Sequence, residues 1–276
     1  MSADQAITQP VRDEIETRLA YIETKEGIRY LLAIESGSRA WGFPSPDSDF
    51  DVRFVYVRPR DDYLSLKQPR DVIEQPIVDD IDLNGWDIRK ALGLMLKQNA
   101  VLSEWIESSI RYRPHDPMVA NLAALGDRHF DPQGYARHYA SLGRSTVKRW
   151  LESEQGVTVK KDFYALRPAL SVRALRMCPQ ARPPMRLQDL MAVTGLPRSL
   201  SEEIEEMVAI KAETREAGSA KPRPAIDAFI ADELDRVEEV ASRPASEEFA
   251  DEANAFFLKL VGAGTWAQLS GFSESC

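Results

Sequence analysis

The sequence predicts an α/β (α+β) domain with a small mixed sheet, followed by an all-helical domain. Short apolar and β-branched runs bounded by turn residues fill the region from 29 to 83, as is typical of strands. Beyond about residue 116 the strand pattern nearly stops, and apolar residues recur at helical spacing. We therefore expect one domain over 1–116 and a second over 117–276. With 276 residues, 43% of them hydrophobic, the chain can build a substantial core.

The first domain should begin with an amphipathic helix over 11–25, because Val11, Ile15, Leu19 and Ile22 recur at helical spacing. The later elements follow from the same two periodicities and from the turn residues between them. They are strands at 29–35, 50–57, 72–74 and 78–83, and helices at 60–66, 88–97 and 101–108.

The second domain should contain seven helical segments. They are expected at 117–126, 132–154, 161–177, 187–194, 200–216, 223–241 and 246–262. Pro168 lies inside the third segment and should start, kink or interrupt that helix, because proline lacks the backbone N–H that a helix interior needs.

Composition narrows the class of protein. The net charge of −9 disfavours a long polynucleotide substrate, which needs a dominant basic surface, but leaves room for an RNA end. The start of the chain carries no signal-peptide pattern, and no apolar run reaches about 18 residues, so we expect no membrane contact. The only cysteines are Cys178 and Cys276, which fits a reducing cytoplasm.

The most informative stretch of the chain runs from 34 to 52. An apolar strand leads into the turn Gly37-Ser38, and after ten further residues a second apolar strand carries Asp49 and Asp51. Alternate side chains of a strand share a face, so the two carboxylates should project from the same face. Phe50, Val52 and Phe54 can then enter a core on the other face.

Carboxylates side by side repel each other unless a cation lies between them, and oxygen ligands favour Mg²⁺. Gly37 lets the backbone approach a ligand closely, and Ser38 offers a hydroxyl and an N–H at the expected start of a short helix, which suits a phosphate. A phosphate cradle beside a carboxylate pair indicates phosphoryl or nucleotidyl transfer. The simpler alternative is a surface turn rich in Ser, Pro and Asp.

The spacing of the Gly-Ser turn and the Asp-Phe-Asp triplet resembles that of the DNA polymerase β-like nucleotidyltransferase superfamily. Five segments, within about residues 28–195, more narrowly resemble the RNA-ligase-associated predicted nucleotidyltransferase family. They are Ser36-Gly-Ser-Arg-Ala-Trp-Gly42, Ser45-Pro-Asp-Ser-Asp-Phe-Asp-Val-Arg-Phe-Val-Tyr56, Asp82-Leu-Asn-Gly-Trp-Asp-Ile-Arg-Lys-Ala91, Ser103-Glu-Trp-Ile-Glu-Ser108 and Lys160-Lys-Asp-Phe-Tyr-Ala-Leu-Arg-Pro168. The last 80 or so residues match no family that we can name from the sequence.

The resemblance implies a minimal nucleotidyltransferase domain, a helical domain that binds nucleotide and substrate, and an active site between them. The expected reaction moves an NMP from an NTP to an acceptor hydroxyl, with Mg²⁺ or Mn²⁺, and the family association suggests an RNA end as acceptor. Asp49 and Asp51 would be the catalytic metal ligands. A third metal ligand is either Asp82, flanked by apolar strand residues, or Asp87, which is also suited to cap the helix at 88. We favour Asp82.

Further residues take roles from the resemblance and from their positions. Gly37, Ser38 and Arg39 would contact the phosphates of the NTP. Arg53 shares the face of Asp49 and Asp51, and we expect it to act mainly as their structural counter-charge. Trp41 could stack on a base or pack beneath the site. The candidates in the helical domain lie on one helix and would grip the triphosphate and base: Lys160, Lys161, Tyr164 and Arg167.

Two rival functions remain open at this stage. The same pocket could bind a nucleotide without turnover, as a regulatory module, although the intact Asp49/Asp51 pair argues against a degenerate copy. The nucleotidyl group could also go to a protein side chain or a small molecule, which the acidic composition favours slightly.

Overall fold

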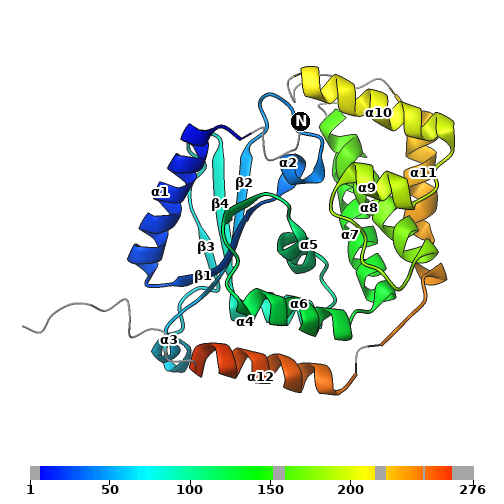
Figure 1. Ribbon diagram of the computed structural model, residues 1–276. Coiled ribbons are helices and arrows are strands. Elements are labelled where there is room, and N and C mark those ends of the chain that lie inside the picture. The colour runs from blue at the N-terminus through cyan, green and yellow to red at the C-terminus, as the bar shows by residue number, and fades with distance from the viewer. Residues whose placement is uncertain (1–6, 152–158, 215–221, 245, 263–276) are drawn as a thin grey trace, which may run out of the picture.

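A five-stranded mixed sheet lies in the first half of the chain (Figure 1). The computed structural model describes residues 7–151, 159–214, 222–244 and 246–262. Strand β1 pairs antiparallel with β2 and β5, β3 pairs antiparallel with β4, and β2 pairs parallel with β4. In spatial order the strands are β3 (Val72–Glu74), β4 (Ile81–Asp87), β2 (Phe50–Val57), β1 (Arg29–Glu35) and β5 (Arg111–Arg113).

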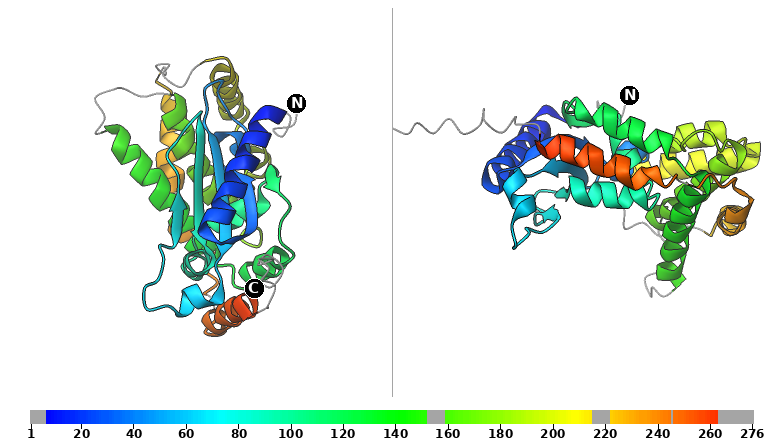
Figure 2. Two further views of the ribbon diagram at one scale, coloured as in Figure 1. Left: turned by 90° about the vertical axis from the view of Figure 1, so that its left-hand side faces the viewer. Right: turned by 90° about the horizontal axis from the view of Figure 1, so that it is seen from below.

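Helix α1 (Gln9–Glu26) covers one face of the sheet, as Figure 2 shows. The predicted apolar stripe of this helix is confirmed, because Ile15, Leu19 and Ile22 are buried and share a core with Val52 and Phe54 of β2. Side chains alternate along a strand, so the neighbouring residues of β2 must face the opposite side of the sheet.

The opposite face is covered by four helices that share a second core with β1 and β2. They are α4 (Ile88–Leu96), α5 (Val101–Glu107), α6 (Met118–Arg128) and α12 (Glu248–Gly262). The short helices α2 (Gly37–Trp41) and α3 (Arg60–Leu64) follow β1 and β2. Because α12 contacts α4 and α6, the last described helix of the chain returns to the sheet half (Figure 2). A domain boundary at 116 remains a prediction.

The remaining helices form a bundle beside the sheet (Figure 1), as the helical periodicity predicted. They are α7 (Pro132–Leu151), α8 (Val159–Met177), α9 (Leu187–Val193), α10 (Arg198–Glu213), α11 (Pro224–Asp235) and the 3₁₀ helix η2 (Val237–Glu239). The mixed α/β first half and the helical second half confirm the predicted fold class. Helix α8 continues through Pro168 as one element, so this proline neither starts nor interrupts the helix, whereas the segment expected at 223–241 is divided into α11 and η2.

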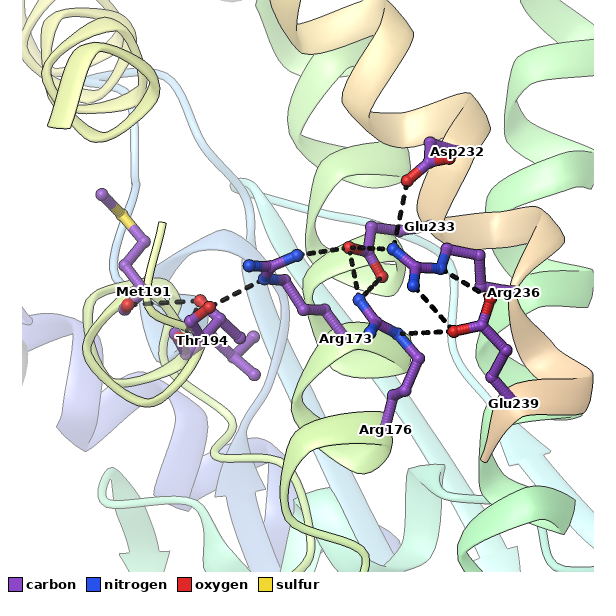
Figure 3. Close-up of polar contacts among 9 residues, drawn as sticks. Arg173, Arg176, Met191, Thr194, Asp232, Glu233, Arg236 and Glu239 are labelled. Carbon is purple, nitrogen blue, oxygen red and sulfur yellow. Dashed lines mark hydrogen bonds and ion pairs between the residues drawn. The ribbon is translucent and has the colours of Figure 1, made fainter. Parts of the chain in front are cut away.

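A buried carboxylate ties three elements of this bundle together, as Figure 3 shows. Glu233 of α11 is 1% exposed and pairs with Arg173 at 2.6 Å and Arg176 at 2.9 Å, both on α8. The Arg173 Nε also donates to the carbonyl of Thr194 at the end of α9. A buried charge needs such partners, so this cluster holds α8, α9 and α11 in one arrangement.

Strand β4 departs from the sequence-based expectation at both ends. It begins at Ile81 instead of 78, because the two aspartates before it adopt positive φ, and it runs on to Asp87. Gly85 lies within the ladder, opposite Phe54. A Cβ at Gly85 would lie 1.9 Å from the Phe54 ring, so the glycine makes room for that ring. The short strand β5 was not predicted.

Candidate active site

The Gly-Ser turn lies directly against Asp51, as the spacing in the sequence predicted. Ser36 follows the last residue of β1 and is the N-cap of α2, and its backbone N–H donates to the Asp51 carbonyl at 2.8 Å. Gly37 has a φ of 58°, a conformation that side chains disfavour. A Cβ at Gly37 would lie 1.8 Å from the Asp51 Oδ2, so only glycine fits between the turn and this carboxylate.

Asp82 lies beside Asp51, because the parallel register of β2 and β4 sets the two residues opposite each other. Both carboxylates pair with Arg53: its Nη2 is 2.9 Å from Asp51 Oδ1 and 2.7 Å from Asp82 Oδ2. The Arg53 Nη1 also donates to the Asp82 carbonyl at 2.9 Å. Arg53 was predicted to be the counter-charge of Asp49 and Asp51; it pairs with Asp51 and, in addition, with Asp82.

Asp87 lies at the other end of β4 and caps the following helix. Its Oδ1 accepts the backbone N–H of Arg89 at 2.8 Å, and its Oδ2 accepts the Tyr63 hydroxyl at 3.0 Å. Burial raises the pKa of Asp87, and these two hydrogen bonds oppose that rise. The predicted capping role is confirmed, and of the two candidates for a third carboxylate only Asp82 adjoins Asp51.

Two buried side chains of α2 stabilise the turn before β2. Asp49 is exposed and lies directly before the first residue of β2. The Arg39 guanidinium is buried over the Phe50 ring, with 4.1 Å to its centroid, and donates to the carbonyl of Ser48 at 2.7 Å. The Ser38 hydroxyl also donates to Ser48, at 3.0 Å. The side chains of Arg39 and Ser38, both predicted to contact phosphate, thus support the loop that carries Asp49.

The predicted basic and aromatic face of α8 meets the turn through Trp41. The Trp41 and Tyr164 rings pack edge to face with 5.4 Å between centroids, and the Arg167 guanidinium lies 4.8 Å from the Trp41 ring centroid. Trp41 therefore packs within the protein, which was one of its two expected roles. Arg167 is buried and pairs with Glu104 of α5 at 2.8 Å. The side chains of Lys160 and Lys161 lie outside the described residues.

Three helices of the bundle hold the segment that follows α2. The Phe43 ring stacks on Phe163 of α8 with 4.5 Å between centroids. The buried Lys211 of α10 donates to the Phe43 carbonyl at 2.9 Å, and Gln188, just inside α9, donates to the Gly42 carbonyl at 2.7 Å. The helical half therefore fixes the position of the turn that contacts Asp51.

One buried carboxylate beneath Asp51 was missed by the sequence reasoning. Glu35, the last residue of β1, is 0% exposed and accepts the backbone N–H of Asp51 at 3.1 Å and the Tyr112 hydroxyl at 2.6 Å. Burial raises the pKa of Glu35 to about 8, and the nearby Asp51 charge adds to the rise, whereas the bond from Tyr112 opposes it. The only signal in the sequence was a charged residue ending an apolar strand.

The donor set fits a Mg²⁺ ion held together with substrate phosphates. Mg²⁺ in such sites takes one or two protein carboxylates, and Asp51 and Asp82 provide two, about a quarter exposed and side by side. Over the described part of the chain, no group of three or more His, Cys, Asp and Glu side chains is placed to hold a metal ion by itself. Substrate oxygens would therefore have to complete the coordination.

Comparison with known proteins identifies the family. Residues 11–259 match the RNA repair pathway DNA polymerase beta family (RlaP), well beyond the 28–195 region in which the sequence motifs lie. The uncharacterized protein YcgL of Bacillus subtilis (strain 168) is 37% identical over 253 residues, covering 91% of this chain and 96% of YcgL. Of the described helices, none has the length and apolar character needed to cross a membrane. The chain belongs to the RNA repair pathway DNA polymerase beta family.

Proposed function

We propose that the protein is a Mg²⁺-dependent nucleotidyltransferase that moves an NMP from an NTP to an acceptor hydroxyl. The observation that supports this most is the contact of the Gly37 turn with Asp51, while Asp51 adjoins Asp82. This arrangement brings a backbone suited to phosphates against two carboxylates suited to a divalent cation. The membership of an RNA repair family favours an RNA end as the acceptor.

Each residue of the site would have a distinct task. Gly37 and Ser38 would contact the outer phosphates at the start of α2, beside the Asp51 carboxylate. Asp51 and Asp82, with Asp49 in the preceding turn, would hold the metal. When bound, Mg²⁺ neutralises charge on the phosphates and so lowers the barrier to transfer. Asp82 would orient the acceptor hydroxyl and take up its proton as the oxygen attacks the α-phosphorus and pyrophosphate leaves.

The helical half would hold the rest of the NTP. The Tyr164 ring contacts the Trp41 ring at the end of α2, so both aromatic residues would lie near the outer phosphates of the NTP. Lys160 and Lys161 belong to the first turn of α8, four residues or fewer from Tyr164. Arg167 would support the site from behind Trp41, because its guanidinium already forms an ion pair with Glu104.

The net charge of −9 favours a second candidate acceptor, a protein side chain or a small molecule. One experiment separates the acceptors. The pure protein is incubated with each α-labelled NTP, Mg²⁺, and either an RNA with a 3′-hydroxyl, the same RNA with a 3′-phosphate, a protein mixture or a set of small alcohols. We expect label on the 3′-hydroxyl RNA together with released pyrophosphate.

Matched variants make the test specific. Asp51→Asn and Asp82→Asn should abolish transfer, because each removes a charged oxygen of the site while keeping the size of the side chain. Asp79→Asn is the control, because Asp79 is exposed and pairs only at the surface with Arg18. If the protein binds NTP but gives neither labelled product nor pyrophosphate with any acceptor, the enzyme hypothesis is refuted. The protein would then be a nucleotide-binding module.

A further inference from the structure

Glu35 is a fully buried carboxylate that the proposed reaction does not use. Burying such a group is costly unless hydrogen bonds compensate, and the partners of Glu35 show what the group does. The partners belong to two parts of the protein: Asp51 of the candidate site and residues of strand β5 and the segment before it.

Towards the site, Glu35 completes a clamp on the backbone of Asp51. The Glu35 Oε1 accepts the Asp51 N–H at 3.1 Å, and the next residue, Ser36, donates its N–H to the Asp51 carbonyl at 2.8 Å. In a regular antiparallel ladder both partners would be backbone groups. Here β1 ends and α2 begins at this point, so the Glu35 side chain supplies the acceptor that the backbone no longer provides.

On its other side, Glu35 is itself held in one orientation. The Tyr112 hydroxyl of β5 donates to Glu35 Oε2 at 2.6 Å. The Ser108 hydroxyl donates to the Glu35 carbonyl at 2.7 Å, and the Glu35 N–H donates to the Ile110 carbonyl at 3.0 Å. A short chain of hydrogen bonds therefore runs from β5 through Glu35 to Asp51.

We propose that Glu35 is a positioning residue that fixes the backbone of Asp51, and through it the carboxylate that receives the metal, with Tyr112 orienting Glu35. Gly37 limits the Asp51 carboxylate on one side and Arg53 on the other, so a small backbone shift cannot be absorbed by the side chain. The inference rests on the proposed function, because it assigns Glu35 to the same reaction.

The test compares three variants with the wild type. Glu35→Met keeps the length of the side chain but removes both acceptors, Glu35→Gln keeps Oε1 as an acceptor, and Tyr112→Phe removes only the orienting hydroxyl. We expect kcat to fall about 100-fold in Glu35→Met, the loss known for misplacement by about 1 Å, with KM for NTP changed less than about threefold. Glu35→Gln should stay within about threefold of the wild type, and Tyr112→Phe should lie between.

A second readout does not need turnover. Binding of Mn²⁺ in the presence of NTP, followed by electron paramagnetic resonance, should weaken about tenfold in Glu35→Met and recover in Glu35→Gln. If the wild type binds Mn²⁺ and NTP but transfers nothing, the proposed function fails while this measurement still tests Glu35. If the wild type binds neither, both proposals fail.

The control for lost stability is Glu233→Gln, which perturbs an equally buried carboxylate in the helical bundle. It should lower the melting temperature and leave kcat of the folded protein unchanged. Wild-type kcat and Mn²⁺ affinity in a folded Glu35→Met protein would overturn the proposal, as would an equal loss in Glu35→Met and Glu35→Gln. If Glu35→Met does not fold, unchanged kcat in Tyr112→Phe overturns it.

Discussion

Replacing Gly37 by alanine should separate two effects: the loss of stability from backbone strain and the loss of kcat from a displaced Asp51 carboxylate. Gly37 has a φ of 58° and Gly27, at the end of α1, has a φ of 60°. An added Cβ meets the Asp51 Oδ2 at 1.8 Å in the first case and nothing within 4 Å in the second. Gly27→Ala is therefore a matched control that carries the same strain without the contact.

The expected magnitudes follow from this geometry. The left-handed conformation should cost each alanine variant roughly 1–2 kcal/mol of the free energy of unfolding. In Gly37→Ala the Asp51 carboxylate must also retreat by roughly 1.5 Å to reach an ordinary van der Waals distance, which strains its ion pair with Arg53. Misplacing a reacting group by about 1 Å can cost about 100-fold in rate, so we expect at least that loss of kcat.

Urea denaturation of both variants measures the free energy of unfolding, and pyrophosphate release with NTP and acceptor measures kcat. Gly27→Ala should lose stability and keep its kcat, whereas Gly37→Ala should lose both. Equal kcat in the two variants would refute the reasoning, because the contact between Gly37 and Asp51 would then have no bearing on the reaction.

Three further changes test the surroundings. Asp87→Ala should cost about 1 kcal/mol as a lost helix cap and leave kcat intact, measured by denaturation and pyrophosphate release; a loss of kcat would return Asp87 to the site. Glu233→Gln should lower the free energy of unfolding by about 1.5–3 kcal/mol, because the half-buried Arg173 and Arg176 lose their shared charged partner, and a change under about 1 kcal/mol would contradict the role of that cluster. Burial raises the pKa of Asp162 to about 6, with Asp227 adding to the rise, so folding disfavours its charge and the wild type should lose stability as pH rises from about 4 to 6. Asp162→Asn should therefore be more stable than the wild type by roughly 1–3 kcal/mol at pH 7 and equal to it near pH 3, and a constant difference in denaturation across that range would contradict the assignment.

Much of the geometry of the candidate site follows from local signals in the sequence. Gly37 and Asp51 are linked by a short segment between two strands, so their proximity follows from strand period and turn chemistry. The family resemblance implied a third carboxylate on a neighbouring strand, and the apolar residues that flank Asp82 favoured it. The register of β2 and β4 sets Asp82 opposite Asp51. Asp87 was recognised as a helix cap because capping depends only on the next two or three residues.

The features that could not be predicted depend on partners far away in the chain. Glu35 is 77 residues from Tyr112, and nothing near it in the sequence indicates that its carboxylate accepts the Asp51 N–H. Arg39 and Arg167 look alike in sequence as cations near the motifs, but one donates to loop carbonyls and the other pairs with a buried glutamate. Which acceptor an arginine finds is decided by packing of the whole chain.

Arg53 explains how Asp51 and Asp82 can lie side by side in the folded protein. Like charges directly opposite on neighbouring strands repel each other, and the guanidinium between them offsets that repulsion. A divalent cation at the same carboxylates would have to share them with Arg53, so the protein groups alone should bind it only weakly. In the proposed reaction the triphosphate would add further oxygen ligands, and the backbone N–H groups at the start of α2 would favour its charge. Metal and nucleotide should therefore bind cooperatively, because each supplies the charge that the other lacks.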